Sequence, residues 1–99
     1  MIRPIRTAKL ASEELTAAVQ WYERQRLGLG GKFFDAILGT IDRISETPEA
    51  GSSFRTLDAR RMLVAGFPYQ IVYRINADAI RLLAFAHLRR RPDFWRHRR

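Results

Sequence analysis

The chain has 99 residues and a mass of 11.5 kDa, the size of one small domain, and 46% of its residues are hydrophobic, which excludes a disordered chain. It contains no cysteine, so a disulfide scaffold, a thiolate metal site and a cysteine nucleophile are excluded. The formal net charge of +8 arises after residue 50, where 11 basic side chains stand against 3 acidic ones, and this excess favours an acidic partner.

The first half of the chain predicts one strand and two helices. Residues Ile2–Thr7 alternate loosely and include a proline, which favours a strand at the edge of a sheet. Apolar residues then recur at helical spacing over Ser12–Leu27, with the serine as the expected N-cap and two glutamates in the first turn. Glu13, Glu14 and Glu23 are expected on a solvated face of this helix. Three glycines in Gly28–Gly31 predict a tight turn, and a second helical pattern covers Gly31–Glu46 until a proline ends it.

The second half of the chain has a hydrophobic period of two, which is typical of strands. We expect strands at Phe54–Leu57, Arg60–Ala65, Tyr69–Asn76 and Ile80–Arg89. The segments between them are too short for crossover connections, so these strands should be antiparallel neighbours. The predicted fold is α+β: one domain over residues 1–99, with a helical hairpin on one face of a small antiparallel sheet.

Strict alternation divides the strand residues between two faces of this sheet. One set is almost entirely apolar and is expected to face the helices: Met62, Val64, Tyr69, Ile71, Tyr73, Ile75, Ile80, Leu82, Ala84 and Ala86. The other set mixes apolar and basic side chains: Arg61, Leu63, Gln70, Val72, Arg74, Arg81, Leu83, Phe85, His87 and Arg89. An apolar patch with a charged rim indicates a binding surface, unless Phe94 and Trp95 of the C-terminal segment cover it.

No segment indicates export or membrane insertion. The longest uncharged apolar run, Leu82–Ala86, is far shorter than the roughly 18 residues that a membrane span needs. No apolar stretch follows the first six residues, so we expect no signal peptide, no membrane partner and a cytoplasmic location.

The order of elements and several local motifs resemble the RelE/ParE toxin superfamily of bacterial type II toxin–antitoxin systems. The similarity extends over nearly the whole chain. The matching segments are Ala18–Glu23, Gly28–Gly30, Ile44–Pro48, Arg60–Val64, Phe67–Arg74 and Ala86–Trp95. The segments Phe67–Arg74 and His87–Trp95 are similar to the ParE-like branch.

The resemblance implies a toxin that inhibits DNA gyrase without cleaving a bond itself. It also implies a ParD-like antitoxin that wraps around the toxin in a hetero-oligomeric complex, and it implies no cofactor. On the mixed face, its rim and the C-terminal segment, the candidate partner-binding residues are Leu63, Val72, Arg74, Arg81, Leu83, Phe85, Arg89, Arg91 and Trp95.

The alternative is a RelE-like endonuclease that cuts mRNA in the ribosome, with Arg61, Arg89 and His87 as candidate catalytic residues. Such enzymes use lysine, arginine and tyrosine where this chain has Leu63, Gln70 and Trp95. Arginine stays charged at neutral pH and is a poor proton donor or acceptor, which leaves only the histidine as a base. His87 and His97 are ten residues apart with no second carboxylate nearby, so no metal site is predicted. A further alternative is a non-toxic, basic nucleic-acid-binding module.

Overall fold

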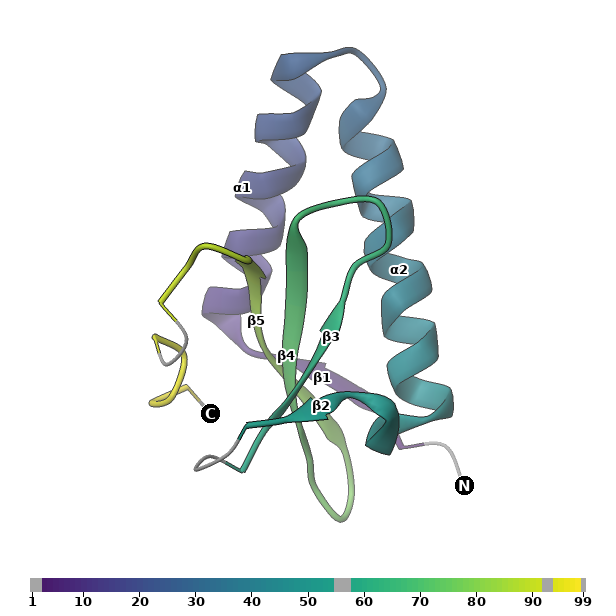
Figure 1. The fold of residues 1–99 in the computed structure, drawn as a ribbon, viewed down its shortest axis with the longest axis vertical. Helices are drawn as coiled ribbons and strands as arrows, with labels where there is room; N and C mark the ends of the chain where they lie inside the picture. Colours follow the sequence, from purple (N-terminus) through teal and green to yellow (C-terminus); the bar gives the residue numbers. More distant parts are fainter. Residues whose placement is uncertain (1–2, 55–57, 92–93, 99) are drawn as a thin grey trace.

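Two helices cover one face of a five-stranded sheet in the computed structural model, which describes residues 3–54, 58–91 and 94–98 (Figure 1). The helical hairpin lies behind the sheet in this view and extends past its upper end, while the C-terminal segment lies beside the last strand. In chain order the elements are β1 (Ile5–Thr7), α1 (Lys9–Gln25), α2 (Leu29–Glu46), the 3₁₀ turn η1 (Pro48–Ala50), β2 (Ser52–Ser53), β3 (Arg60–Leu63), β4 (Tyr69–Ile75) and β5 (Ile80–His87).

The sheet has the strand order β1-β5-β4-β3-β2 and is mixed. Strands β2 to β5 are antiparallel neighbours, as the short connections predict. Strand β1 lies at an edge, as its proline suggested, but it pairs parallel to β5, with Ile5 opposite Ile80. A parallel partner is possible here because the whole helical hairpin and three strands separate β1 from β5 in the chain.

Strand β2 is short and does not coincide with the predicted strand at Phe54–Leu57. It consists of Ser52 and Ser53, opposite Arg61 and Arg60 of β3. Phe54 follows the strand, and its N–H donates to the carbonyl oxygen of Ala59 at 3.0 Å. The remainder of the predicted segment, residues 55–57, lies outside the described residues.

The helical hairpin begins earlier than its sequence suggests. The N–H of Ala8 still donates to Leu82 of β5 at 2.9 Å, and α1 starts at the next residue. Ser12 therefore lies inside the first helical turn, where its N–H bonds to Ala8 at 3.0 Å, so the prediction of an N-cap at Ser12 is wrong. Gly28, with a φ of 87°, provides the left-handed conformation that the turn between the helices requires.

The main core lies between the hairpin and the sheet. Fully buried side chains of α2 pack there against fully buried side chains of the sheet. They are Phe33, Ile37 and Ile44 of α2, Ile71 and Tyr73 of β4, and Ile80 and Leu82 of β5. An aromatic cluster extends this core towards the hairpin tip: the Tyr22 ring centroid lies 4.8 Å from that of Phe33 and 5.1 Å from that of Phe67. Burial on this scale is the main source of stability in so small a domain.

A β-bulge in β5 changes which side chains face the helices. Val72 of β4 lies opposite Ala84, but the next residue, Tyr73, lies opposite Leu82, so Leu83 is an extra residue in the ladder. Alternation is displaced by one position after the bulge. The prediction that Phe85 and His87 lie on the mixed face is therefore wrong, and so is the assignment of Ala84 and Ala86 to the helix side. Phe85 is 3% exposed within the main core.

Candidate functional site

The C-terminal segment around residues 94–98 covers the apolar part of the second face of the sheet. Trp95 is 1% exposed and packs with Val72, Leu83 and Ala84 in a second apolar cluster. The ring of Phe54 lies against it, with the two centroids 4.8 Å apart. The alternative that aromatic residues of this segment cover the face is confirmed. Val72, Leu83 and Trp95, three candidate partner-binding residues, thus lie buried within the chain.

Glu14 of α1 and Arg98 of the C-terminal segment fix this cover in place. Two guanidinium nitrogens of Arg98 donate to the two carboxylate oxygens of Glu14, at 2.7 and 3.0 Å. Oε1 of Glu14 also accepts the N–H of Phe85 at 3.2 Å, and Arg98 donates to the carbonyl oxygen of Leu83 at 3.1 Å. Both side chains are mostly buried, with 17% and 12% of their surface exposed.

This ion pair takes the place of a strand along the outer edge of β5. Strand β1 pairs with β5 only as far as Leu82, because the chain then enters α1. Beyond Leu82, the carboxylate of Glu14 accepts the N–H of Phe85, and the guanidinium of Arg98 donates to the carbonyl oxygen of Leu83. These two side chains thus bond to β5 as the backbone of a neighbouring strand would. Glu14 was expected on a solvated helix face, and that expectation is wrong.

Glu23 is a second glutamate of α1 with a structural role, and it is half-buried where a solvated face was expected. Its carboxylate accepts the N–H groups of Gly28, at 2.9 and 3.1 Å, and of Gly30, at 3.0 Å. It therefore satisfies N–H groups at the start of α2, where a negative charge also favours the helix dipole.

Three arginines form a row across the second face of the sheet. Arg81 of β5 lies opposite Arg6 of β1 and opposite Arg74 of β4, and residues opposite one another in a sheet share a face. Arg74 donates to the carbonyl oxygen of Asp58 at 2.8 Å. Arg74 and Arg81 were predicted for this face from alternation, whereas Arg6 was missed because its strand pairs with β5 over a long sequence separation.

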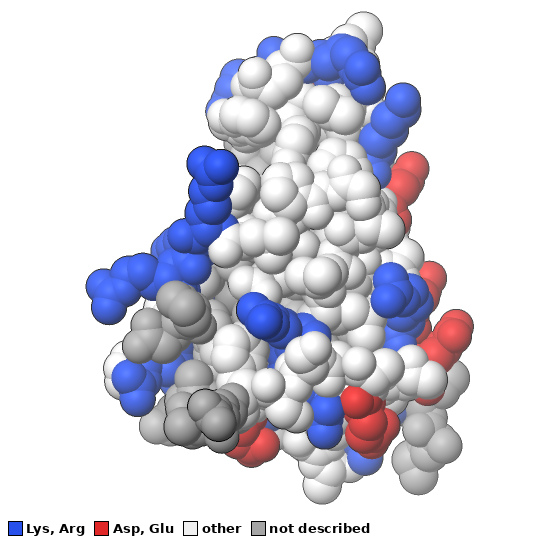
Figure 2. All heavy atoms as spheres, in the orientation of Figure 1, with Lys and Arg blue, Asp and Glu red and all other residues white. Residues whose placement is uncertain are grey.

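The other basic candidates lie at the surface around this face. Arg61 of β3 is exposed, and its guanidinium carbon lies 5.7 Å from the centroid of the Phe54 ring. Arg89 and Arg91 follow β5 and are also exposed. In Figure 2, basic side chains project from the side where the C-terminal segment lies, while most of the visible acidic side chains lie towards α2 and the base of the molecule.

His87 does not join the two arginines with which it was grouped as a possible catalytic residue. It lies opposite Tyr69 on the helix side of the sheet, with the ring centroids 5.4 Å apart. Its Nδ1 accepts the N–H of Arg89 at 3.1 Å. Arg61, opposite Val72, lies on the other face. The candidate catalytic residues therefore do not converge on one site.

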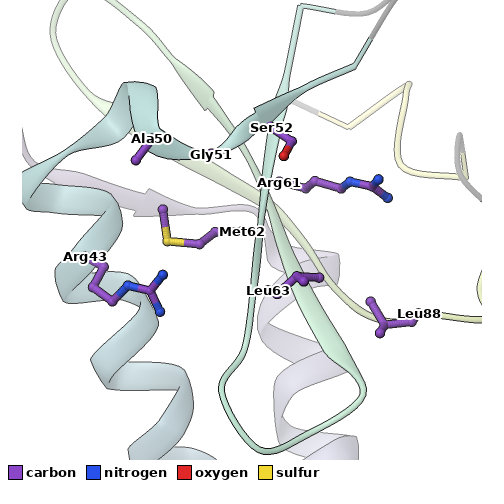
Figure 3. Close-up of a pocket in the computed structure, with 8 residues that line it drawn as sticks. All are labelled: Arg43, Ala50, Gly51, Ser52, Arg61, Met62, Leu63 and Leu88. Atoms are coloured by element: carbon purple, nitrogen blue, oxygen red, sulfur yellow. The ribbon is translucent and has the colours of Figure 1, made fainter.

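A hollow of about 530 Å³ lies between α2 and β3 (Figure 3). Arg43 of α2 points towards β3 on one side of the strand, next to Met62, while Leu63 and Leu88 lie on the other side. Leu63 is 59% exposed and Leu88 46% exposed. Arg43 was not among the predicted candidates, because nothing in its helical spacing distinguishes it from a solvated arginine.

Across residues 3–54, 58–91 and 94–98, no three histidine, aspartate or glutamate side chains gather in an arrangement that could hold a metal ion. Within the same residues, neither helix combines the length and the apolar character that crossing a membrane requires.

The sequence matches the model of one protein family, described as the ParE toxin of the type II toxin–antitoxin system parDE, over residues 5–92. The chain belongs to the ParE toxin family. A solved structure of the chromosomal ParDE toxin–antitoxin system from P. aeruginosa contains a chain of similar fold, with a TM-score of 0.73 and 14% sequence identity. The match covers 87% of this chain and 96% of that chain. No curated protein matches the sequence.

Membership of the ParE toxin family confirms the family that the sequence motifs suggested and places the chain in a type II toxin–antitoxin system. The fold is the one that the resemblance implied, with a helical hairpin on one face of the sheet.

Proposed function

We propose that this ParE family member inhibits DNA gyrase by binding to it, and that a cognate ParD-like antitoxin neutralises it. The row of arginines at positions 6, 81 and 74 supports a binding mode of action. Arg6 is exposed and Arg74 is partly exposed, and their positive charge can hold a protein with acidic side chains or a phosphate-bearing complex. The exposed Arg89 and Arg91 extend this charge beyond β5.

The position of His87 is the observation that favours inhibition by binding over cleavage of mRNA. Cleavage by attack of a 2′-hydroxyl needs a group that accepts a proton beside the cations that stabilise the phosphate. The arginines lie on the second face and its rim, whereas His87 lies on the helix side against Tyr69. Arginine stays protonated, so the arginines favour holding a target over proton transfer.

The test is expression of the chain without its antitoxin, followed by supercoiling assays with purified gyrase and translation assays with ribosomes. The His87→Gln variant keeps a polar side chain and loses the titratable group, so we expect growth arrest and gyrase inhibition to persist. Arg89→Ala with Arg91→Ala removes two exposed charges and should weaken both. A matched control is Arg24→Ala with Arg26→Ala, which removes two exposed arginines of the same spacing at the hairpin tip.

The opposite pattern would support the endonuclease. Loss of a general base reduces a rate by about 10²–10⁴-fold, so a folded His87→Gln protein without toxicity and without ribosome-dependent cleavage would overturn the proposal. Circular dichroism shows whether each variant is folded. For the antitoxin, co-expression of the protein encoded next to this chain should restore growth and yield a complex on gel filtration.

A further inference from the structure

Two adjoining hollows form a groove on the helix side of the sheet, between α1 and the ends of β4 and β5. Their volumes are about 290 and 380 Å³, near the lower end of the ~300–1,000 Å³ that is usual for the sites of small ligands. Trp21, Tyr69 and His87 line both hollows. In Figure 1 these residues belong to the upper part of the sheet, where β4 begins and β5 ends beside α1.

Trp21 is the exposed aromatic wall of this groove. Its side chain is 51% exposed, although tryptophan is on average a highly buried residue. Its ring meets that of Tyr22 edge to face, with the centroids 5.1 Å apart and the planes at 85°, and Tyr22 in turn packs on Phe33 of the core. The indole is thus held by the core and still has free surface, as a platform for stacking a flat ring requires.

Three hydrogen-bond donors on aromatic rings line the groove without a partner among the described residues. They are the indole N–H of Trp21, the hydroxyl of Tyr69 and the Nε2–H of His87. Nδ1 of His87 accepts the N–H of Arg89 at 3.1 Å, so the neutral ring carries its proton on Nε2. Burial and the Glu14 carboxylate raise the pKa of Tyr69 above 10.0, so its hydroxyl is a donor at neutral pH. An apolar occupant would leave these donors unpaired at a cost in free energy, which favours an occupant with acceptors.

One end of the groove is positively charged. Arg90, in the turn after β5, lines the smaller hollow together with Glu14. Arg98 donates to both carboxylate oxygens of Glu14 and offsets its charge. Arg90, 3.7 Å from that carboxylate, therefore leaves a net positive charge at this end, and the exposed Arg89 and Arg91 stand next to it in the chain. This charge favours an anionic group on the occupant.

We propose that this groove binds a nucleotide, with the base stacked against Trp21 and the phosphate near Arg90. A nucleobase offers a flat ring face to the indole and ring acceptors to Tyr69 and His87, and its phosphate is complementary to the charge at Arg90. The nucleotide is either free or part of a single strand of nucleic acid. The inference does not rest on the proposed function, because the groove lies on the other side of the sheet from the row of arginines at positions 6, 81 and 74.

The test follows the two indole N–H resonances of the ¹⁵N-labelled chain during titration with deoxyadenosine monophosphate. The chain has two tryptophans, and Trp95 is 1% exposed in the second apolar cluster, so its resonance reports on changes away from the groove. The nucleotide should shift the Trp21 resonance and leave that of Trp95 in place. Deoxyadenosine lacks the phosphate and deoxyribose 5-phosphate lacks the base, so each should bind at least about fivefold more weakly.

Variants of the chain separate the stacking surface from the donors, with equilibrium dialysis of labelled nucleotide as the measurement and circular dichroism as the check of folding. Trp21→Ala should weaken binding at least about fivefold, and Trp21→Phe, which keeps a ring face, should restore most of it. Tyr69→Phe keeps its ring in the aromatic cluster but loses the hydroxyl, so binding should weaken about two- to tenfold. The matched control is Phe34→Ala, which removes an exposed ring of α2 outside the groove and should leave binding unchanged.

An octamer of deoxyadenylate distinguishes the two sources of the nucleotide. Octamer binding that is at least about tenfold tighter than that of the monophosphate, with a steeper dependence on salt, would identify single-stranded nucleic acid. Equal affinities would identify the free nucleotide.

Several results would overturn nucleotide binding in this groove. These are a Trp21 resonance that neither the monophosphate nor the octamer shifts, equal binding of the monophosphate and deoxyribose 5-phosphate, and unchanged affinity in a folded Trp21→Ala protein. Tighter binding of an acidic peptide that contains tryptophan would also overturn it, because a segment of a partner protein would then fill the groove.

Discussion

Glu14 and Arg98 are 84 residues apart in the chain and form a two-pronged ion pair that completes the outer edge of β5. Arg90 adds a weaker contact to Glu14 at 3.7 Å and stacks over the Phe94 ring, 4.0 Å from its centroid. One carboxylate thus holds helix α1, strand β5 and the C-terminal segment together.

The Glu14→Gln change tests this role directly. It keeps the size of the side chain but removes the charge that Arg98 and the Phe85 N–H share, so the free energy of unfolding should fall by about 1.5–3 kcal/mol. Urea unfolding followed by circular dichroism measures the change. Glu13→Gln, at the exposed neighbouring position, is the control and should stay within about 0.5 kcal/mol of the parent. Equal midpoints for the two variants would contradict the structural role of Glu14.

Phe85 and Leu63 provide a test of the bulge. Phe85 lies in the main core, so Phe85→Ala should destabilise the chain by about 3–5 kcal/mol. Leu63 is 59% exposed, so Leu63→Ala should change stability by less than about 0.5 kcal/mol. If strict alternation held, Phe85 would tolerate the change with little loss. Thermal unfolding of the two variants against the parent protein decides between these patterns.

Two glycines of α2 should respond to alanine in opposite directions. A Cβ at Gly30 would lie 2.7 Å from the carbonyl oxygen of Val19, so the two helices would have to separate. Gly39 has no atom within 4 Å of such a Cβ and lies in the helix interior, where alanine is favoured by about 0.5–1 kcal/mol. Gly30→Ala should lower the melting temperature, and Gly39→Ala should raise it. A rise for both would show that the helices are not in close contact at Gly30.

Because the hydroxyl of Tyr73 is buried, we expect the folded chain to lose stability at alkaline pH. Burial of its hydroxyl raises the pKa of Tyr73 above the ordinary value of 10.0. The folded chain then holds this proton more tightly than the unfolded chain, so the stabilisation is complete below about pH 10 and falls as the pH rises further. Burial also raises the pKa values of Tyr22 and Tyr69, which act in the same direction.

Urea unfolding over a series of alkaline pH values checks this linkage. The Tyr73→Phe variant should be less stable at neutral pH, by about 1–3 kcal/mol, because the Gly51 N–H and the Pro48 carbonyl lose their partner. Its stability should nevertheless depend less on pH above about pH 10, because one titrating group is gone. The same alkaline slope in both proteins would contradict the proposed contribution of Tyr73.

The residues that the sequence placed correctly are those governed by local periodicity. The two helices, the strands β3, β4 and β5, and the burial of Ile71 follow from apolar spacing alone. The bulge at Leu83 could not be recognised, because Leu83 and Ala84 are both apolar and the pattern on either side still alternates. The misplacement of Phe85 and His87 follows from that one residue.

Most of what the sequence missed depends on contacts between distant parts of the chain. Nothing near Glu14 indicates that its partner is Arg98, and nothing near Arg6 indicates that it will lie beside Arg81. The course of the chain just before β2 likewise depends on a hydrogen bond from the N–H of Gly51 to the hydroxyl of Tyr73, 22 residues away. Periodicity describes which face a side chain occupies, whereas these features depend on which strand or segment comes to lie next to it.

The parallel pairing of β1 with β5 also determines when the molecule can fold during translation. Among the strands of the described residues, β1 is the first to leave the ribosome, yet the strand with which it pairs, β5, is the last to be synthesised. The ion pair between Glu14 and Arg98 likewise cannot form until Arg98 has been synthesised. A nascent chain interrupted before β5 therefore carries an incomplete core, and chaperones or proteases would meet it as an unfolded protein. A function that depends on the assembled sheet can therefore appear only after β5, Ile80–His87, has been synthesised.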